Sequence, residues 1–391
     1  MKVFYTLLIL LIPFVGFGQE IEWEHIYSES TTGFNVFELD NGEFIFYTSP
    51  NILRTTEMGE IIWSIEVGHW NAFAGTPTSD GGFVMGGDGG GGMIKLNSEG
   101  EIEWENNDDF PSLWYLIETN NGDLIGTGFD NMILYRYTSN GDFIWSEDYF
   151  TGTHTSRGLI LTNDDGIVIV GKTNSNKGVL IKVDSEGEIL WNEEYQYDDF
   201  QTFFYKGVET PDNGFIITGS TNISDDDEHY QALVIKTNSF GEEQWAEQFE
   251  FDDDESYVGG IFCTSDNGYI FTGGHADDMM WIVKLDASAD TLWTMEFGNT
   301  HGGGASIIQT DDDGYVIAGT YYDDDGSEPT NKRAVLIKLD ASQINNVIEL
   351  NLKNSKPIIL DLLGREIKPQ PNSPYIEIYD DGTVEKKVII E

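Results

Sequence analysis

The sequence has one cysteine and few basic residues, and these shortages exclude several classes of protein. Because Cys263 has no second thiol to pair with, the chain can form no internal disulfide, and its stability must come from packing. The 20 lysines and arginines face 69 aspartates and glutamates, and the net charge of -49 excludes a binder of nucleic acid or of anionic membranes as the first interpretation. After residue 15 no apolar run approaches the roughly 20 residues that a membrane-spanning helix needs.

Disorder does not follow from this acidity, because the chain is rich in residues that build a core. It holds 23 Phe, 18 Tyr, 10 Trp and 44 Gly, and 39% of its residues are hydrophobic, unlike an aromatic-poor acidic tail. We therefore expect a large folded protein.

The first 18 residues have the pattern of a secretory signal peptide. Lys2 supplies the basic start, residues 3–15 the apolar run, and Gly16 and Gly18 the small residues before a cleavage site. We predict cleavage between Gly18 and Gln19. An uncleaved membrane anchor is the alternative, although the run is short for a bilayer span. The sequence thus predicts a protein that is secreted or displayed on the outer cell surface.

Residues 19–342 repeat one pattern seven times. Each unit holds a turn glycine before an apolar run, then an aliphatic stretch with a basic residue, then a segment of the form Gly-Glu-Ile-x-Trp. The turn glycines are Gly42, Gly82, Gly122, Gly166, Gly214, Gly268 and Gly314. The basic residues are Arg54, Lys95, Arg136, Lys182, Lys236, Lys284 and Lys338. The tryptophans are Trp23, Trp63, Trp104, Trp145, Trp191, Trp245 and Trp293. Successive landmarks of one kind lie 40 to 54 residues apart.

Within a unit the pattern is strand, turn, strand, without a segment of helical period. Asp312-Asp313-Gly314 and Ser185-Glu186-Gly187 are typical hairpin corners, which supply the positive backbone angles that tight turns need. Four antiparallel strands in about forty residues are typical of a β-propeller blade. The predicted fold class is therefore all-β, a seven-bladed β-propeller over residues 19–342.

The order of the landmarks predicts how the ring closes. Trp23 precedes the first turn glycine, whereas no repeat tryptophan follows Lys338. Seven complete blades therefore require residues 20–25 to supply the last strand of the last blade. This pairing of first strand with last leaves no open sheet edge.

The repeated side chains have both a structural and a functional interpretation. We interpret the tryptophans as packing between neighbouring blades. The basic residues alternate with aliphatic neighbours, as in Ile181-Lys182-Val183, so we expect them to pair with carboxylates on the opposite strand face. A ring of cations that binds anions is the alternative.

Residues 343–391 differ in composition from the repeats. They contain four of the ten prolines, two of the 44 glycines and no tryptophan, and their net charge of -2, with the +1 of the leader, leaves -48 on residues 19–342. Short strands are expected at residues 357–361, 375–379 and 384–390, in a small β-rich C-terminal module.

This module carries a resemblance to a known family. Two segments, ILDLLGREI at residues 359–367 and PYIEIYDDGTVEKKVII at residues 374–390, are similar to the C-terminal sorting domain of the type IX secretion system. The resemblance implies a Bacteroidota-type bacterium, with export across the inner membrane, passage through the outer membrane by the type IX machinery, and release or surface attachment. A small β-cap on the propeller is the alternative.

The repeats in turn resemble the quinoprotein-like and Kelch-like propellers. The segment Gly-Glu-Ile-x-Trp is similar to the tryptophan docking element of quinoprotein blades, and Asp80-Gly81-Gly82 is similar to the Kelch double glycine. The resemblance implies a fold, but propellers host many functions.

No catalytic or cofactor-binding residue can be assigned from the sequence. The run from Gly87 to Gly92 satisfies G-x-G-x-x-G, but it joins two strands with no helix behind it, and Asp88 would repel a phosphate. We interpret His301-Gly302-Gly303-Gly304 as an inter-blade loop, because the chain lacks the G-x-S-x-G motif of a serine hydrolase. The six histidines lack the spacing of zinc or copper ligands, and Cys263 is interpreted as a small buried apolar residue.

Four acidic loop runs are the one feature that suits a cation. They lie at residues 225–228, 252–255, 311–313 and 323–325. Clustered loop carboxylates suit Ca²⁺, which takes about 6–8 oxygen ligands, although none of the runs matches an EF-hand loop. Solvated loops are the preferred interpretation, and an ordered Ca²⁺ site is the alternative.

The sequence favours a monomeric, non-enzymatic propeller that serves as a binding scaffold for an extracellular glycan or protein. Residues 220–231 and 320–333 form longer inserts between the second and third strands of blades five and seven, so we expect both on one face, with Tyr321 and Tyr322 as candidate contacts. The alternative is an enzyme. A carbohydrate-active propeller would need facing carboxylates, and a quinone-dependent dehydrogenase is disfavoured because a tricarboxylate cofactor needs cations that a charge of -48 does not offer.

Overall fold

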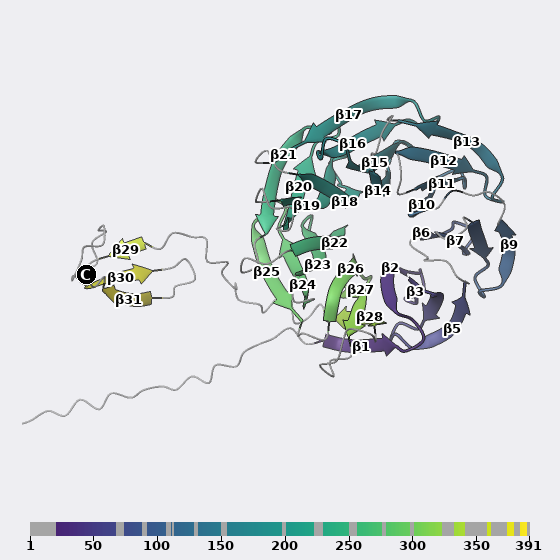
Figure 1. Cartoon of the computed structure of the whole chain (residues 1–391). Helices are drawn as coiled ribbons and strands as arrows, with labels where there is room; N and C mark the ends of the chain where they lie inside the picture. The colour runs from purple at the N-terminus through teal and green to yellow at the C-terminus, as the bar shows by residue number, and fades with distance from the viewer. Residues whose placement is uncertain are drawn as a thin grey trace, which may run out of the picture. The chain divides into compact units, whose positions relative to one another are not determined.

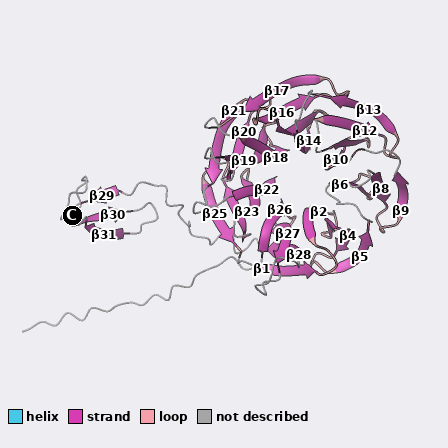
Figure 2. Ribbon diagram, viewed as in Figure 1, coloured by secondary structure: helices cyan, strands magenta, loops and turns pink. Residues whose placement is uncertain are grey.

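The computed structural model describes residues 21–67, 74–87, 92–106, 111, 113–128, 132–149, 155–197, 201–222, 230–249, 256–275, 279–297, 301–322 and 332–340, together with strands at 358–360, 374–378 and 384–388. These residues form seven four-stranded antiparallel sheets and one three-stranded sheet. The seven sheets are arranged radially around one axis as a seven-bladed β-propeller, which confirms the predicted fold class (Figure 1). In the part of the chain that is described there is no helix, and so no helix that could cross a membrane (Figure 2).

In every blade the four strands lie side by side, and their order leads from the axis to the rim. The inner strands are β2 (Thr32–Glu38), β6 (Ala74–Pro77), β10 (Tyr115–Glu118), β14 (Thr155–Leu161), β18 (Thr202–Glu209), β22 (Ser256–Cys263) and β26 (His301–Gln309). The second strands are β3 (Phe44–Ser49), β7 (Phe83–Gly87), β11 (Leu124–Thr127), β15 (Ile167–Lys172), β19 (Phe215–Asn222), β23 (Tyr269–His275) and β27 (Tyr315–Tyr322).

The outer half of each blade follows the same order. The third strands are β4 (Asn51–Thr55), β8 (Gly92–Leu96), β12 (Ile133–Tyr137), β16 (Gly178–Val183), β20 (Tyr230–Thr237), β24 (Met279–Leu285) and β28 (Lys332–Leu339). The rim strands are β5 (Ile61–Glu66), β9 (Ile102–Asn106), β13 (Phe143–Asp148), β17 (Ile189–Tyr195), β21 (Glu243–Phe249), β25 (Thr291–Glu296) and β1 (Ile21–Tyr27).

The N-terminal strand closes the ring, as the landmark order predicted. Blade seven has the strand order β26-β27-β28-β1, so its rim strand comes from the start of the chain. Strand β1 pairs antiparallel with β28, with Trp23 opposite Lys338 and Tyr27 opposite Ala334. The Tyr27 hydroxyl also donates a hydrogen bond of 2.7 Å to the Gly59 carbonyl of blade one. Both ends of the propeller sequence are therefore held in one sheet, and β28 is not left as an open edge.

The core lies between neighbouring blades. Val234 and Phe249 of blade five pack with Phe271 and Trp281 of blade six in one buried cluster. The second strands are almost wholly buried, because each of their faces meets the sheet of a neighbouring blade. This explains why these segments read as continuous apolar runs instead of alternating ones.

The repeated tryptophans dock each blade onto the next, which confirms their structural interpretation. The Trp63 ring lies 6.0 Å from the Phe83 ring, between centroids, and the Trp293 ring lies 6.1 Å from the Tyr315 ring. In each pair the partner opens the second strand of the following blade. The same contact joins Trp23 of blade seven to Phe44 of blade one at 6.1 Å, so it is made across the closure as well.

The turns between the inner and second strands correct one detail of the sequence interpretation. In five blades the positive φ belongs to the residue before the turn glycine: Gly81 (83°), Asp165 (63°), Asn213 (60°), Asn267 (66°) and Asp313 (65°). The glycine that follows is required for space instead. A Cβ on Gly268 would lie 2.3 Å from the Leu285 carbonyl oxygen and 2.5 Å from Lys284 Nζ, so the repeated lysine occupies the room that the missing side chain leaves.

The C-terminal strands form a separate sheet. Strands β29 (Ile358–Leu360), β30 (Pro374–Ile378) and β31 (Val384–Val388) pair antiparallel in that order, close to the ranges expected from the sequence. The propeller, Ile21–Ser342, is a compact unit of its own. The predicted signal peptide, residues 1–18, lies outside the described residues.

Candidate functional site

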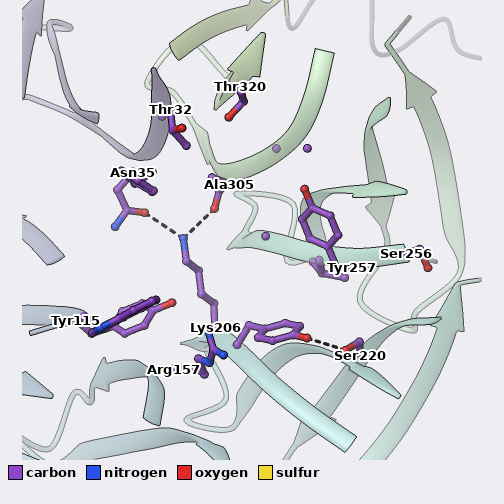
Figure 3. Close-up of a pocket in the computed structure, with 18 of the residues that line it drawn as sticks. Thr32, Asn35, Tyr115, Arg157, Lys206, Ser220, Ser256, Tyr257, Ala305 and Thr320 are labelled. Carbon is purple, nitrogen blue, oxygen red and sulfur yellow. Dashed lines mark hydrogen bonds between the residues drawn. The ribbon is translucent and has the colours of Figure 1, made fainter. Parts of the chain in front are cut away.

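The inner strands enclose a cavity of about 570 Å³ at the axis of the propeller. It is lined from six of the seven blades, by residues 32–35, 114–115, 157, 205–206, 220, 230, 256–259, 303–305 and 320 (Figure 3). Cavities of about 300–1,000 Å³ are the usual size of small-molecule sites. This cavity is therefore the candidate functional site.

Bulges in the inner strands turn particular side chains into the cavity. Strands β2, β14, β18 and β22 each shift register by one residue, and the residues that the register skips are Phe34, Arg157, Tyr205 and Gly259. All four of these residues line the cavity. Because a bulge adds one residue to one strand and redirects its side chain, the lining depends on these irregularities in otherwise regular blades.

The two sides of the cavity differ in chemistry. Blades three to five contribute large side chains, among them Tyr115, Arg157, Tyr205 and Lys206, whereas blades six and seven contribute glycines, among them Gly304. A Cβ on Gly304 would lie 2.0 Å from Thr272 Oγ1, so no larger residue fits there without rearrangement. One wall is thus aromatic and cationic, and the opposite wall combines glycine backbone with the ring of Tyr257 and smaller side chains.

This glycine-rich wall corrects the interpretation of residues 301–304. They are not an inter-blade loop but the beginning of β26, the inner strand of blade seven. The strand has register shifts between Gly302 and Gly304 and between Gly304 and Ser306. The missing side chains let β26 bulge twice at the cavity and pack against the neighbouring blade, where a Cβ on Gly259 would lie 2.0 Å from the Gly304 carbonyl oxygen.

Lys206 spans the cavity from blade five to blades one and seven. Its Nζ donates hydrogen bonds to the Ala305 carbonyl oxygen at 2.8 Å and to Asn35 Oδ1 at 3.3 Å (Figure 3). Burial lowers the pKa of Lys206 to about 8, and no carboxylate of the described residues pairs with it. The ammonium group therefore remains mostly charged at neutral pH, with neutral acceptors as its described partners.

Arg157 lies on the same wall among aromatic side chains. Its guanidinium carbon is 5.7 Å from the centroid of the Trp114 ring, within range of a cation–π interaction. Burial raises the pKa of Tyr115 to about 12, against an opposing effect of Arg157, and burial also raises the pKa of Tyr205. The Tyr205 hydroxyl shares a hydrogen bond of 2.8 Å with Ser220 Oγ. These phenols are neutral hydrogen-bonding groups at neutral pH.

Among the residues that the structure describes, the acidity of the protein does not extend into the cavity. Arg157 and Lys206 are the charged residues of its lining, which includes no aspartate or glutamate among the described residues. The argument from a charge of -48 against an anionic ligand therefore does not carry over to this site. The described part of the lining does not contain the pair of facing carboxylates that a carbohydrate-active enzyme would need.

The seven repeated basic residues all pair with carboxylates, which confirms the structural interpretation over an anion-binding ring. The pairs are Arg54–Glu43 (2.6 Å), Lys95–Asp80 (2.9 Å), Arg136–Asp123 (2.8 Å), Lys182–Asp164 (2.6 Å), Lys236–Asp212 (3.0 Å), Lys284–Asp266 (2.9 Å) and Lys338–Asp312 (2.6 Å). Each cation also lies opposite a repeated tryptophan, as Lys182 lies opposite Trp191.

Lysine and arginine use different carboxylates in these pairs. Each lysine binds an aspartate two positions before the turn glycine, such as Asp266 before Gly268. In the two arginine blades the acidic residue just after the glycine binds the arginine, and an asparagine stands two positions before that acidic residue, as Asn121 does before Asp123. Arg136 reaches further and also donates to the Ser185 carbonyl of the next blade. The repeated cations are structural.

The acidic runs do not form a cation site in the part of the chain that is described. Asp312 pairs with Lys338, the Asp311 amide donates to Glu38, and Asp313 accepts from Ser265. The runs at 225–228, 252–255 and 323–325 lie outside the described residues. No group of three or more His, Cys, Asp or Glu side chains within the described ranges could hold a metal ion.

The two inserts join strands whose ends border the cavity. Ser220 and Tyr230 flank the insert of blade five and Thr320 precedes that of blade seven, and all three residues line the cavity. Tyr321 and Tyr322 do not line it. Tyr322 packs on Gly302, and Lys332 Nζ lies 5.5 Å from the centroid of its ring. The strands that carry the inserts therefore reach the cavity, whereas the candidate contacts Tyr321 and Tyr322 are not among its lining residues.

Cys263 and the described histidine side chain lie away from the cavity. Cys263 Sγ contacts the Glu209 carbonyl oxygen at 3.8 Å, and burial raises the thiol pKa to about 11. His25 is on rim strand β1, with its ring 5.6 Å from that of Trp23. Neither is placed for chemistry on a ligand at the axis.

Comparison with known proteins identifies the fold. No protein-family model and no curated protein matches the sequence. Among solved structures, the chain is similar to virginiamycin B lyase from Staphylococcus aureus, with a TM-score of 0.59 at 13% identity over 80% of this chain and 98% of that one. It is also similar to the WD40 β-propeller domain of Doa1 (0.59, 9% identity, 82% and 97% covered) and to BamB from Moraxella catarrhalis (0.52, 12% identity, 82% and 99% covered). At such identities these likenesses establish the propeller fold alone.

Proposed function

We propose that this protein is a secreted, non-enzymatic binding protein whose ligand occupies the central cavity of the propeller. The observation that carries the proposal is the cavity itself, about 570 Å³ of space walled by two cations, several aromatic rings and backbone. The lining residues offer hydrogen-bond donors and flat apolar surfaces, which suit recognition. A cavity of this size takes a small molecule, a short glycan or an extended peptide segment, and not a folded domain.

The blades make the cavity a rigid site. Most wall residues are carried on inner strands that are hydrogen-bonded into four-stranded sheets, and Lys206 ties three blades together across the axis. A preformed site loses little conformational entropy when a ligand binds, so affinity does not depend on folding of a loop. This rigidity favours binding as the role of the site.

The export route belongs to the same proposal. The signal-peptide pattern of residues 1–18 and the sorting-domain motifs of residues 359–367 and 374–390 support secretion by a type IX-like route. In a host with that system, a chain that lacks residues 343–391 should remain in the periplasm while the full chain reaches the cell surface or the medium. Equal appearance of both chains in the medium would contradict this assignment.

The binding proposal is tested by filling the cavity. The Asn35 side chain lies in the cavity beside Lys206, so Asn35→Trp should occupy ligand space. Ile189→Trp, on the rim strand β17 where Ile189 is 51% exposed, adds the same side chain away from the cavity and serves as the matched control.

Thermal unfolding would be followed with a panel of mono- to tetrasaccharides, aromatic carboxylates and short peptides. At a concentration 100 times its Kd, a bound compound adds about 2.7 kcal/mol to the stability of the folded protein. Compounds that stabilise the wild-type protein and the Ile189→Trp variant should fail to stabilise the Asn35→Trp variant. If every stabilising compound acts equally on all three proteins, the cavity is not the binding site.

A further inference from the structure

We propose that Lys206 and Arg157 make the central cavity an anion-binding site, which takes a carboxylate, sulfate or phosphate group carried on an aromatic or other flat apolar body. The inference rests on the proposed function, because it names the chemical class of the ligand that the cavity holds. The anionic group would bind at Lys206, with Arg157 as the second cation of the lining, and the flat body would lie along the aromatic side chains of the cavity.

The first observation is that Lys206 departs from a rule that the rest of the propeller follows. Every repeated basic residue has a carboxylate within 2.6 to 3.0 Å. Lys206 bonds to an amide oxygen and a carbonyl oxygen instead, and no described carboxylate reaches it. In a chain with 69 acidic residues, a counter-ion for one lysine would be easy to supply. A desolvated cation without one is unfavourable in the empty protein and favours an anion that arrives from outside.

The second observation is the donor capacity that remains on Lys206. An ammonium group has three N–H donors. Two of them are used by Ala305 and Asn35, which hold the side chain extended across the cavity (Figure 3). The third N–H is left for a ligand. Because the first two bonds already order this long side chain, binding an anion adds little entropic cost.

The third observation is the wall around Arg157. A guanidinium group presents planar, paired N–H donors that match the two oxygens of a carboxylate, sulfate or phosphate. The guanidinium carbon of Arg157 lies 5.7 Å from the centroid of the Trp114 ring, and Tyr115, Tyr205 and Tyr257 line the same cavity. Aromatic rings beside a cation provide stacking surface for a flat ligand body. Tyr257 packs on the opposite wall, where its hydroxyl occupies the room that a side chain on Gly303 would need.

The net charge of the protein opposes the approach of an anion but not its binding. Exposed charges are screened over about 8 Å at physiological ionic strength, so the acidic rim acts weakly on a ligand already in the cavity. Inside, the nearest charges are those of Lys206 and Arg157, in an environment of lower dielectric constant where their attraction is stronger. The acidic surface therefore slows association, and the cavity determines affinity.

A series of naphthalene probes with one body and different head groups tests the inference. Isothermal titration calorimetry at pH 7 would compare 2-naphthoate, 2-naphthyl sulfate and 2-naphthyl phosphate with neutral 2-naphthol. The wild-type protein should bind the best anion at least 10-fold tighter than 2-naphthol, since a hydrogen bond to a charged group contributes enough for about a 10- to 100-fold preference. The order of the three anions identifies the preferred head group.

Two variants separate charge from fold. Lys206→Met keeps a long side chain but removes the charge, and it should lose the preference for the anion while 2-naphthol binds unchanged. Lys177→Met removes a lysine that is paired with Glu194 outside the cavity, and it should bind every probe like the wild-type protein. Equal thermal stability of the two variants would show that the loss is not a folding effect.

A pH titration gives a second readout. The other titratable side chains of the cavity lining are Arg157, Tyr115, Tyr205, Tyr230 and Tyr257. Burial raises the pKa of Tyr115 and of Tyr205, and burial lowers the pKa of Lys206 to about 8. Raising the pH from 7 to 9 should therefore neutralise Lys206 first and weaken 2-naphthoate binding about 10-fold. The Lys206→Arg variant should keep its affinity over this range.

The outcomes distinguish the inference from the proposed function. If all four probes bind the wild-type protein and Lys206→Met equally, but none binds Asn35→Trp, the cavity is the binding site and the anion inference is wrong. If the probes bind Asn35→Trp as well as the wild-type protein, the proposed function is wrong too. An absence of anion binding to the wild-type protein would also overturn the inference.

Discussion

Replacing Asp312 by asparagine should destabilise the propeller by about 2 kcal/mol, because it removes the counter-ion of a buried lysine. Lys338 is only 4% exposed, and its Nζ lies 2.6 Å from Asp312 Oδ1. The same carboxylate oxygen accepts from Thr310 Oγ1 and from the Gly314 amide. Asparagine keeps an oxygen at this position but not the charge. Asn121 occupies the equivalent turn position in blade three, where it accepts from Thr119 at 2.6 Å, so the substitution suits the turn.

The magnitude follows from both partners of the pair. Partial burial would raise the pKa of Asp312, but hydrogen bonds from Lys338, Thr310 and Gly314 outweigh it and lower the pKa from 3.8 to about 2. That difference corresponds to about 2.4 kcal/mol at about 1.36 kcal/mol per pH unit. The carboxylate is 63% exposed, so solvent screening reduces its share to about 1 kcal/mol. A fully enclosed charge without a counter-ion costs about 3–5 kcal/mol. Lys338 in the variant keeps its hydrogen bond to Thr310, so we expect its loss of the counter-ion to contribute about 1 kcal/mol of the total.

Equilibrium unfolding in guanidinium chloride measures this loss, and the double variant isolates its cause. Once Lys338→Met has removed the buried ammonium, Asp312→Asn should cost less than about 0.5 kcal/mol further. Equal effects of Asp312→Asn in the wild-type and Lys338→Met backgrounds would refute the ion-pair explanation. So would an Asp312→Asn variant as stable as the wild-type protein.

The pH dependence of the same difference has a definite sign. The pKa of Asp312 is lower in the folded protein than its ordinary value of 3.8, so the carboxylate stabilises the fold above pH 4. This contribution is lost as the pH falls toward about 2, where Asp312 becomes protonated in the folded state. The gap in stability between the wild-type protein and Asp312→Asn should therefore be full at pH 6 and nearly absent at pH 2. A gap that is constant from pH 6 to pH 2 would contradict the assignment.

The remaining predictions concern the ring itself. Deleting residues 19–27 should destabilise the propeller by more than about 5 kcal/mol, because it removes β1 together with Trp23, whose burial alone accounts for about 3–5 kcal/mol. Circular dichroism melting would measure this loss of stability. A variant that melts like the intact protein would disprove closure by this strand. Arg136→Lys should lower the free energy of unfolding by about 1–2 kcal/mol, because lysine lacks the planar guanidinium that binds Asp123 and the Ser185 carbonyl together. Lys177→Arg, at an exposed ion pair, is the control and should leave the free energy of unfolding unchanged in the same assay.

The architecture could be predicted because its determinants are local and repeated. A turn glycine, a cation and a tryptophan recur in each unit, and each landmark corresponds to one contact that every blade makes. Closure by β1 followed from the landmark order alone, since Trp23 has no turn glycine before it. Two repeated signals were missed. Threonine precedes the paired aspartate by two positions, as Thr310 precedes Asp312, and a tyrosine such as Tyr27 hydrogen-bonds the next blade four residues after the tryptophan.

The cavity could not be predicted in the same way, because its residues do not repeat. Several lining residues lie three or four positions before the last residue of the inner strand, where the blades carry different residues. Blade five has Tyr205 and Lys206 there, blade six has Gly259 and Gly260, and blade four has Arg157. A comparison of the units for their most variable position would have found it. That the strand bulges at this point, and so aims Arg157 and Tyr205 at the axis, is not encoded by any local motif we recognise.

The net charge shows most clearly which properties the sequence determines and which depend on the tertiary structure. Composition and repeats determined a seven-bladed acidic propeller, its closing strand and the pairing of its repeated cations, because each of these depends on residues near one another in the chain or on a periodic pattern. Only the tertiary structure decided that Lys206, Asn35 and Ala305 meet, since they come from three different blades. Where these residues meet, positive charge lies at the axis of a protein with a net charge of -49. Side chains that converge from separate sheets create a local electric field, and the net charge of the whole chain does not reveal that field.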